Sequence, residues 1–191
     1  MMAAPVDEPL KSDSRSDREL IVAINDGDSD AFEALYYRYR DWVVGLAYRF
    51  TGDRELALDV LQETFLYLVR KFPGFRLTAQ LKTFLYPAVR NLSIAARRKA
   101  ERFQSNENEE GTIEAVITAE PVLSHDDSLA AALALLSEEH REVLLLRFVD
   151  GLSLAEIAET LSIPLGTVKS RLHNALACLR HDRRTKTYFE Q

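Results

Sequence analysis

Apolar side chains recur every three or four positions along most of this chain, which is the spacing of amphipathic α-helices. Caps and breakers divide the pattern into segments, with aspartate or serine before several of them and glycine or proline after them. The pattern predicts helices over residues 17–26, 30–50, 54–71, 83–102, 128–136, 138–148 and 153–160, and a last helix that begins between Pro164 and Thr167. We therefore expect an all-α fold.

The helices fall into two groups, which predicts two small helical domains. The first would cover residues 17–104 and the second residues 127–191. Residues 105–126 are acidic and show only a short apolar patch, so we expect a flexible linker there. Residues 1–16 are mostly polar and acidic and predict a disordered tail.

Charge is separated into blocks along the chain, although the whole carries a net charge of only −6. Residues 76–104 hold 7 basic and 1 acidic side chains, and residues 167–186 carry a net charge of +5. The intervening residues 105–127 hold 7 acidic side chains and no basic one. An anionic partner should therefore touch the chain twice. Because the acidic linker can lie against the basic blocks, we expect the free protein to bind DNA weakly.

Several classes of protein are disfavoured by composition. No apolar run approaches the length of a membrane span, and the N-terminus lacks the apolar core of a signal peptide, so we expect a cytoplasmic protein with no membrane insertion. A single cysteine excludes an internal disulfide, and the four histidines show no metal-ligand spacing. We expect no metal, no cofactor, no small-molecule substrate and no catalytic residues.

The most informative stretch, residues 151–180, predicts a helix-turn-helix. Ala158 is small enough for two helices to cross closely, and Pro164 ends the first helix. The second helix would bury one apolar stripe and turn hydrogen-bonding and cationic groups outward, as a helix that enters the DNA major groove does. A helical hairpin within a core is the alternative. The candidate DNA-binding residues of this helix are Thr167, Lys169, Ser170, Arg171, His173 and Asn174.

A second candidate site combines cations with aromatic side chains, over residues 75–102. Flat rings can stack on unpaired bases while the cations hold phosphates. The alternative is that the aromatic side chains belong to the core. The candidates for contact with a melted strand are Arg76, Lys82, Phe84, Tyr86, Arg90, Asn91, Arg97 and Arg98. Pro87 conflicts with a continuous helix, so we expect the helix either to begin late, with Pro87 in its first turn, or to kink there.

The predicted helix over residues 54–71 leaves Asp59, Gln62, Glu63 and part of Leu66 exposed. Two carboxylates one turn apart can serve acid–base or metal chemistry, but no third ligand or phosphate loop accompanies them. The simpler interpretation is a face that only meets solvent, and the more specific one is a surface on which a protein partner docks.

Three segments resemble regions 2 and 4 of the extracytoplasmic-function sigma factors in the bacterial sigma-70 family. They are DVLQETFLYLVRKFPGFR (59–76), LKTFLYPAVRNLSIAARRKAER (81–102) and LSEEHREVLLLRFVDGLSLAEIAETLSIPLGTVKSRL (136–172). The similarity covers about residues 20–104 and 127–182. In this family, tryptophan is common at the position of Phe84 and glycine at the position of Ser162.

The resemblance implies a subunit that gives core RNA polymerase its promoter specificity. Asp59, Gln62, Glu63 and Leu66 would then dock on the clamp of the largest polymerase subunit, and region 4 would meet the polymerase flap. Residues 75–98 would open and hold the −10 element, the helix from Thr167 would read the −35 element as duplex, and an anti-sigma factor would be a further partner. Three rival interpretations are a two-domain helix-turn-helix regulator, an enzyme, and a protein that sequesters polymerase without initiating transcription.

Overall fold

The computed structural model describes residues 13–107 and 127–181, which form eight helices and no strand. The predicted all-α class is therefore confirmed. The helices are α1 (Asp17–Asn25), α2 (Ser29–Thr51), α3 (Arg54–Val69), α4 (Leu81–Glu107), α5 (Asp127–Ala134), α6 (Glu138–Phe148), α7 (Leu154–Leu161) and α8 (Leu165–His181). None of the helices in these ranges is long and apolar enough to cross a membrane. The tail up to residue 12 and most of the predicted linker lie outside the described residues.

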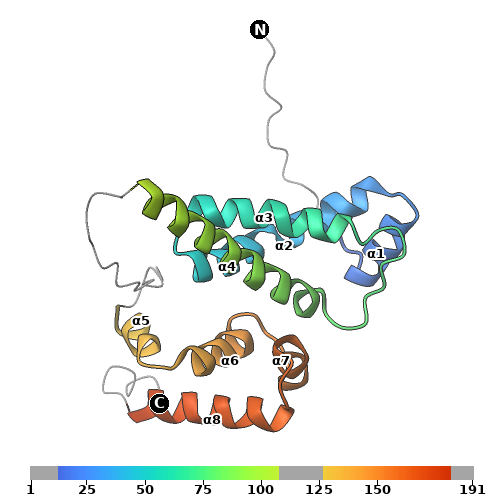
Figure 1. Ribbon diagram of the computed structural model, residues 1–191. Coiled ribbons are helices and arrows are strands. Elements are labelled where there is room, and N and C mark those ends of the chain that lie inside the picture. The colour runs from blue at the N-terminus through green and yellow to red at the C-terminus, as the bar shows by residue number, and fades with distance from the viewer. Residues whose placement is uncertain (1–12, 108–126, 182–191) are drawn as a thin grey trace.

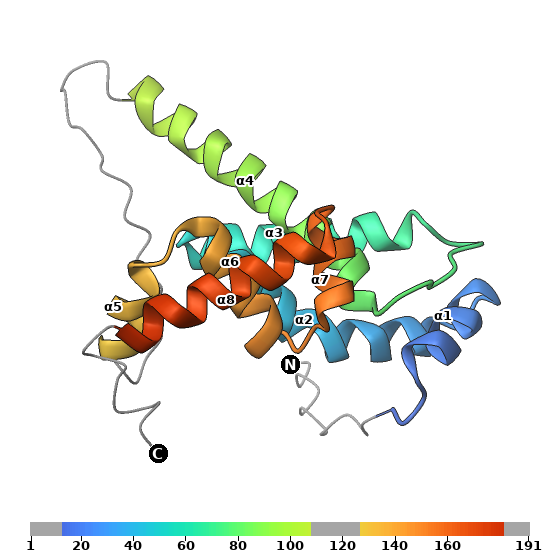
Figure 2. The ribbon, with the colours of Figure 1, turned by 90° about the horizontal axis from the view of Figure 1, so that it is seen from below.

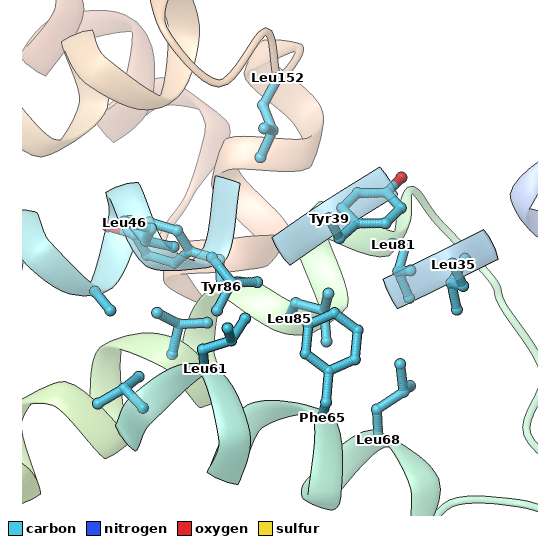
Figure 3. Packing of buried hydrophobic residues seen from close by; sticks show 14 of the residues in the cluster. Leu35, Tyr39, Leu46, Leu61, Phe65, Leu68, Leu81, Leu85, Tyr86 and Leu152 are labelled. Carbon is cyan, nitrogen blue, oxygen red and sulfur yellow. The ribbon is translucent and has the colours of Figure 1, made fainter. Parts of the chain in front are cut away.

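Helices α1 to α4 form an N-terminal unit, and α5 to α8 form a C-terminal unit below it in the view of Figure 1. Within the first unit α2, α3 and α4 pack on one another, and α1 packs on α2. Their shared core contains Leu35, Val43, Leu46, Val60, Phe65, Leu68, Leu85 and Val89 (Figure 3). Burying each such side chain contributes about 1.5–3 kcal/mol, so these three helices hold the unit together.

Short-range caps determine where the first helices begin. The Oγ of Ser16 accepts a hydrogen bond from the Glu19 amide, while the Ser16 amide donates to the Glu19 carboxylate at 2.6 Å. Asp53 caps α3, and Asp28 caps α2, where the sequence allowed either Asp28 or Ser29. Gly52 ends α2 in the left-handed conformation with φ of 68°.

Residues 13–16 belong to the folded unit, although their composition predicts part of the tail. The Arg15 guanidinium bonds Asp13 at 2.7 Å and Asp28 at 3.0 Å, which ties the chain to the start of α2. Asp17 follows Ser16 in the chain, and its carboxylate pairs with the Arg38 guanidinium at 2.7 Å. A polar composition predicted disorder, but here the polar groups bond one another.

Helix α4 begins at Leu81, before Pro87 rather than around it. Pro87 occupies the second turn, so the first of the two alternatives, a late start with Pro87 in the first turn, is wrong. The other alternative, a kink at Pro87, stays a prediction. Leu81 and Leu85 precede it on the same face and are fully buried. Their burial, at about 1.5–3 kcal/mol each, offsets the roughly 3 kcal/mol that an internal proline costs a helix. At its other end α4 runs to Glu107, three residues into the predicted linker.

The C-terminal unit contains the predicted helix-turn-helix, α7 followed by α8. Ser153 and Glu156 form a second reciprocal cap at the start of α7. Ser162 follows α7 with φ of 53°, a left-handed conformation that favours glycine. Helix α8 begins directly after Pro164, as predicted. Its buried stripe is Val168, Ala175 and Leu179, with Leu172 and Leu176 half-buried.

One hydrophobic cluster spans the two units, and a second lies within the C-terminal unit alone. Leu152 and Ile157 of the C-terminal unit are fully buried and belong to the same cluster as Leu85 of α4. Helix α7 packs against α4, and Figure 3 shows Leu152 projecting toward Leu46 and Tyr86. Seen from below in Figure 2, the far end of α4 extends beyond this contact.

Candidate nucleic-acid and protein interfaces

The outer face of α8 presents polar and cationic groups to solvent. Lys169, Ser170, His173 and Asn174 are exposed, and Thr167 is half-buried in the first turn. The Ser170 hydroxyl donates to the Thr167 carbonyl oxygen at 3.0 Å. This face therefore combines two hydrogen-bonding side chains and an imidazole beside a cation, the groups that contact base edges and phosphates.

Arg171 differs from its neighbours on α8 because it has a partner within its own unit. Its guanidinium pairs with the Glu139 carboxylate of α6 at 2.8 Å, and only 21% of its side chain is exposed. Glu139 is 65% exposed, so solvent screens the pair and it contributes at most about 1 kcal/mol. A phosphate or guanine could replace Glu139 at small cost.

The candidates around α4 divide into exposed and engaged groups. Arg76, Asn91 and Arg98 are exposed, and Arg97 pairs with Glu101 one turn along the helix at 3.4 Å. Lys82, Tyr86 and Arg90 instead face the C-terminal unit. Lys82 Nζ donates to the Asp150 carbonyl oxygen at 2.8 Å, the Tyr86 hydroxyl donates to Glu142 at 2.7 Å, and Arg90 pairs with Glu142 at 3.2 Å.

Tyr86 is the most enclosed of these candidates, with 3% of its surface exposed. Burial is the larger cause that raises the pKa of its hydroxyl far above the ordinary value, and the neighbouring Glu142 carboxylate adds to it. The hydroxyl therefore stays protonated and acts as a donor at neutral pH.

Phe84 lies in an aromatic cluster at the start of α4. Its ring stacks on Tyr67 with centroids 5.8 Å apart and contacts Phe75 at 4.7 Å. Lys71 lies over the Tyr67 ring at 4.6 Å. Phe84 and Phe75 are half-buried, so the cluster packs on the core with one side and faces solvent with the other.

Asn25 fixes the loop that carries this cluster, and no motif or spacing in the sequence pointed to it. Its side-chain oxygen accepts from the Gly74 amide at 2.6 Å and from the Phe75 amide at 3.1 Å. Its side-chain nitrogen donates to the Phe75 carbonyl oxygen at 2.9 Å. One side chain at the end of α1 thus holds a loop about 50 residues away.

The exposed face of α3 carries all four docking candidates. Asp59, Gln62 and Glu63 are exposed, and Leu66 is 47% exposed. The first three line a groove of about 500 Å³ whose opposite wall on α4 includes Lys99 and Phe103. No three metal-ligating side chains gather within the described part of the chain. The face thus joins acidic and apolar groups of the kind that protein partners contact.

Asp150 and Glu142 are further residues that the sequence pattern did not single out. Both reach from the C-terminal unit to side chains of α2 and α4. Asp150 lies in the turn after α6, where an acidic side chain is as ordinary as in any polar loop. Only the packing of the two units reveals its partners.

Two family models match the chain in the order in which the units occur. The model for Sigma-70 region 2 matches residues 35–103, and the model for Sigma-70 region 4 matches residues 132–181. The first match spans α2 to α4, and the second spans α6 to α8 with part of α5.

Curated relatives and solved structures agree with these matches. The chain is 31% identical over 176 residues to the ECF RNA polymerase sigma factor SigW of Bacillus subtilis, covering 85% of this chain and 94% of SigW. It is 39% identical over 156 residues to the ECF RNA polymerase sigma factor SigL of Mycobacterium tuberculosis, covering 79% and 84%.

Two solved structures share the fold. CnrH in complex with the cytosolic domain of CnrY gives a TM-score of 0.60 at 21% identity, covering 91% of this chain and 97% of CnrH. RpoE of Bartonella quintana in complex with the anti-sigma factor NepR gives 0.57 at 24% identity, covering 78% and 94%. With both regions matched in order and relatives similar over most of its length, the chain belongs to the extracytoplasmic-function sigma factors of the sigma-70 family.

Proposed function

We propose that this chain binds core RNA polymerase and directs it to specific promoters, where transcription then begins. The observation that carries the proposal is the coincidence of two family regions with two helical units, each of which presents a cationic helix. The chain acts as a specificity subunit, in the cytoplasm, without a cofactor, a metal or a catalytic residue of its own.

The proposed −35 reader is the outer face of α8. Ser170, His173 and Asn174 would discriminate base edges in the major groove, and each good bidentate contact contributes about 1–3 kcal/mol to discrimination. Lys169 and Thr167 would hold the flanking phosphates. Arg171 would exchange its contact with Glu139 for one with the duplex. The exchange costs little free energy, because Glu139 is exposed and solvent screens the pair.

The proposed −10 site is the aromatic cluster together with the cations of α4. Phe84 and Phe75 offer a half-exposed platform on which an unpaired base can stack, at about 1–3 kcal/mol per base. Arg76, Asn91, Arg97 and Arg98 line the path of the strand from the loop along α4. Lys82, Tyr86 and Arg90 complete the set once they are free of the C-terminal unit.

The proposed polymerase contact is the α3 face. Asp59, Gln62, Glu63 and Leu66 would dock on the clamp of the largest subunit, while the C-terminal unit meets the flap. The structural neighbour RpoE was solved with the anti-sigma factor NepR, which supports an anti-sigma factor as a further partner of this chain.

The test is transcription with purified core polymerase on a promoter obtained from a genomic fragment library. Wild-type protein should produce transcripts from start sites that core polymerase alone does not use. Asp59→Lys together with Glu63→Lys should abolish association with core, because both side chains are exposed on the docking face. Glu33→Lys, an equally exposed change on α2, is the matched control and should remain active. Equal activity of the docking variant would contradict the assignment of α3.

A further inference from the structure

The Asp150 carboxylate is paired only across the contact between the two units. It is buried, with 1% of its side chain exposed. Trp42 Nε1 donates to it at 2.7 Å, and Arg49 lies 2.9 Å from each of its oxygens. Among the described residues, every hydrogen bond to this carboxylate comes from α2, about 100 positions earlier in the chain. Because a buried charge needs partners, Asp150 is satisfied only when the units are closed.

Glu142 makes the second polar contact between the units. Its carboxylate, 14% exposed, lies between the Tyr86 hydroxyl at 2.7 Å and the Arg90 guanidinium at 3.2 Å. Lys82 contributes a third contact, to the backbone oxygen of Asp150. An anion held by a hydroxyl and a guanidinium is the arrangement expected for a DNA phosphate.

We infer that the free protein is closed by its own C-terminal unit, in which Glu142 and the Asp150 carbonyl occupy the −10 groups of α4 in place of the promoter strand. The inference rests on the proposed function for the role of those groups. Leu152 and Ile157 supply the apolar part of the contact, since both are fully buried in the shared core. Asp150 acts as a latch through Arg49 and Trp42.

The closed contact masks one surface and leaves two open. Lys82, Tyr86 and Arg90 are engaged, whereas the exposed residues of α3 and of α8 remain accessible. Core polymerase can therefore dock on the closed protein, and a separation of the units must precede capture of a melted strand. Most of the acidic linker, which the sequence suggested as the mask, lies outside the described residues. In the structure the carboxylate of the C-terminal unit that meets α4 is Glu142 of α6, and Asp150 reaches α4 only through its backbone oxygen.

The chain carries its own reporter of opening. Trp42 is its single tryptophan, its indole bonds the latch, and Lys82 lies 5.7 Å from its ring. Removing the latch should shift Trp42 emission to longer wavelength and increase its quenching by acrylamide. The full chain should be compared as wild type and as Asp150→Ala and Glu142→Gln variants, with helical content followed by circular dichroism. Glu159→Gln is the matched control, because Glu159 is exposed on α7 and the substitution also removes one negative charge.

Binding of a fluorescein-labelled single-stranded DNA of mixed sequence, about 20 nucleotides long, measures the masking itself. If the wild-type protein is open in roughly one molecule in ten, Asp150→Ala should tighten this binding by up to about tenfold, because apparent affinity scales with the competent fraction. Glu142→Gln keeps the shape of the side chain and should act in the same direction even if Asp150→Ala misfolds. Glu159→Gln should change neither signal.

Two results would overturn the inference. One is unchanged Trp42 quenching in both latch variants, which would mean that these carboxylates do not hold the units together. The other is exposure of Trp42 without tighter DNA binding, which would mean that the contact masks nothing. Failure of the proposed function is distinguishable, since it would appear as absent transcription with core polymerase while the Trp42 signal still reports opening.

Discussion

Asn25→Ala should loosen the loop that presents the aromatic platform, without replacing any of the side chains proposed to contact DNA. Asn25 is half-buried and makes three hydrogen bonds to the backbone of Gly74 and Phe75, with lengths between 2.6 and 3.1 Å. The substitution deletes all three bonds at once. The loop then depends on the packing of Phe75 against Phe72 and Phe84.

The expected cost follows from the number and setting of these bonds. A neutral hydrogen bond contributes about 0.5–1.5 kcal/mol net, and water can replace part of that at a half-buried site, so we expect a loss of about 2 kcal/mol. Asn25→Asp keeps the acceptor for the Gly74 and Phe75 amides and removes only the donor. Its loss should be about 1 kcal/mol.

Two assays check this prediction. Urea denaturation followed by circular dichroism should rank the variants as wild type, then Asn25→Asp, then Asn25→Ala in free energy of unfolding. Permanganate reactivity of unpaired thymines in the complex of polymerase and promoter should fall in the same order, because the platform is less well positioned. Asn174→Ala, on the exposed face of α8, should change the free energy of unfolding by no more than about 0.5 kcal/mol. Wild-type stability and opening in Asn25→Ala would refute the role of this anchor.

Three further predictions concern single side chains. Ser162→Gly should raise the free energy of unfolding by about 0.5–1 kcal/mol in urea denaturation, because φ of 53° disfavours a side chain; a loss of stability would contradict this. Burial and Glu142 raise the pKa of Tyr86, so the contribution of Tyr86 to the free energy of unfolding should be constant below about pH 10 and fall as the pH rises toward the folded-state pKa; urea midpoints measured above about pH 10 should show a shallower fall in Tyr86→Phe. Arg171→Ala should weaken gel-shift binding of the holoenzyme to its promoter more than to unrelated DNA, and equal losses on both would assign Arg171 to phosphate.

Much of the fold could be predicted because the sequence marks helix ends with side chains that act locally. The aspartate and serine caps, such as Asp53 before α3, and the Pro164 break before α8 concern neighbours in sequence, and the structure has them where the pattern predicts them. The start of α4 ahead of Pro87 could not be predicted, because burial of Leu81 and Leu85 offsets the local cost of the proline and only the tertiary packing decides that burial.

The contacts between distant segments could not be predicted in the same way. Asn25 and Asp150 each bond groups that lie about 50 to 100 positions away in the chain. Neither residue type nor spacing distinguishes a polar side chain that anchors a remote loop from one that faces solvent. The exposed face of α8 could be predicted, because the spacing of apolar positions within a single helix determines which side chains point away from its buried stripe.

The central claim is tested most directly by mixing the purified chain with core RNA polymerase and mapping RNA 5′ ends on a library of genomic fragments. The account predicts a stable complex and a new set of start sites, preceded by shared −35 and −10 sequences, that depends on both cationic helices. A chain that neither associates with core polymerase nor creates a start site in this assay would contradict it.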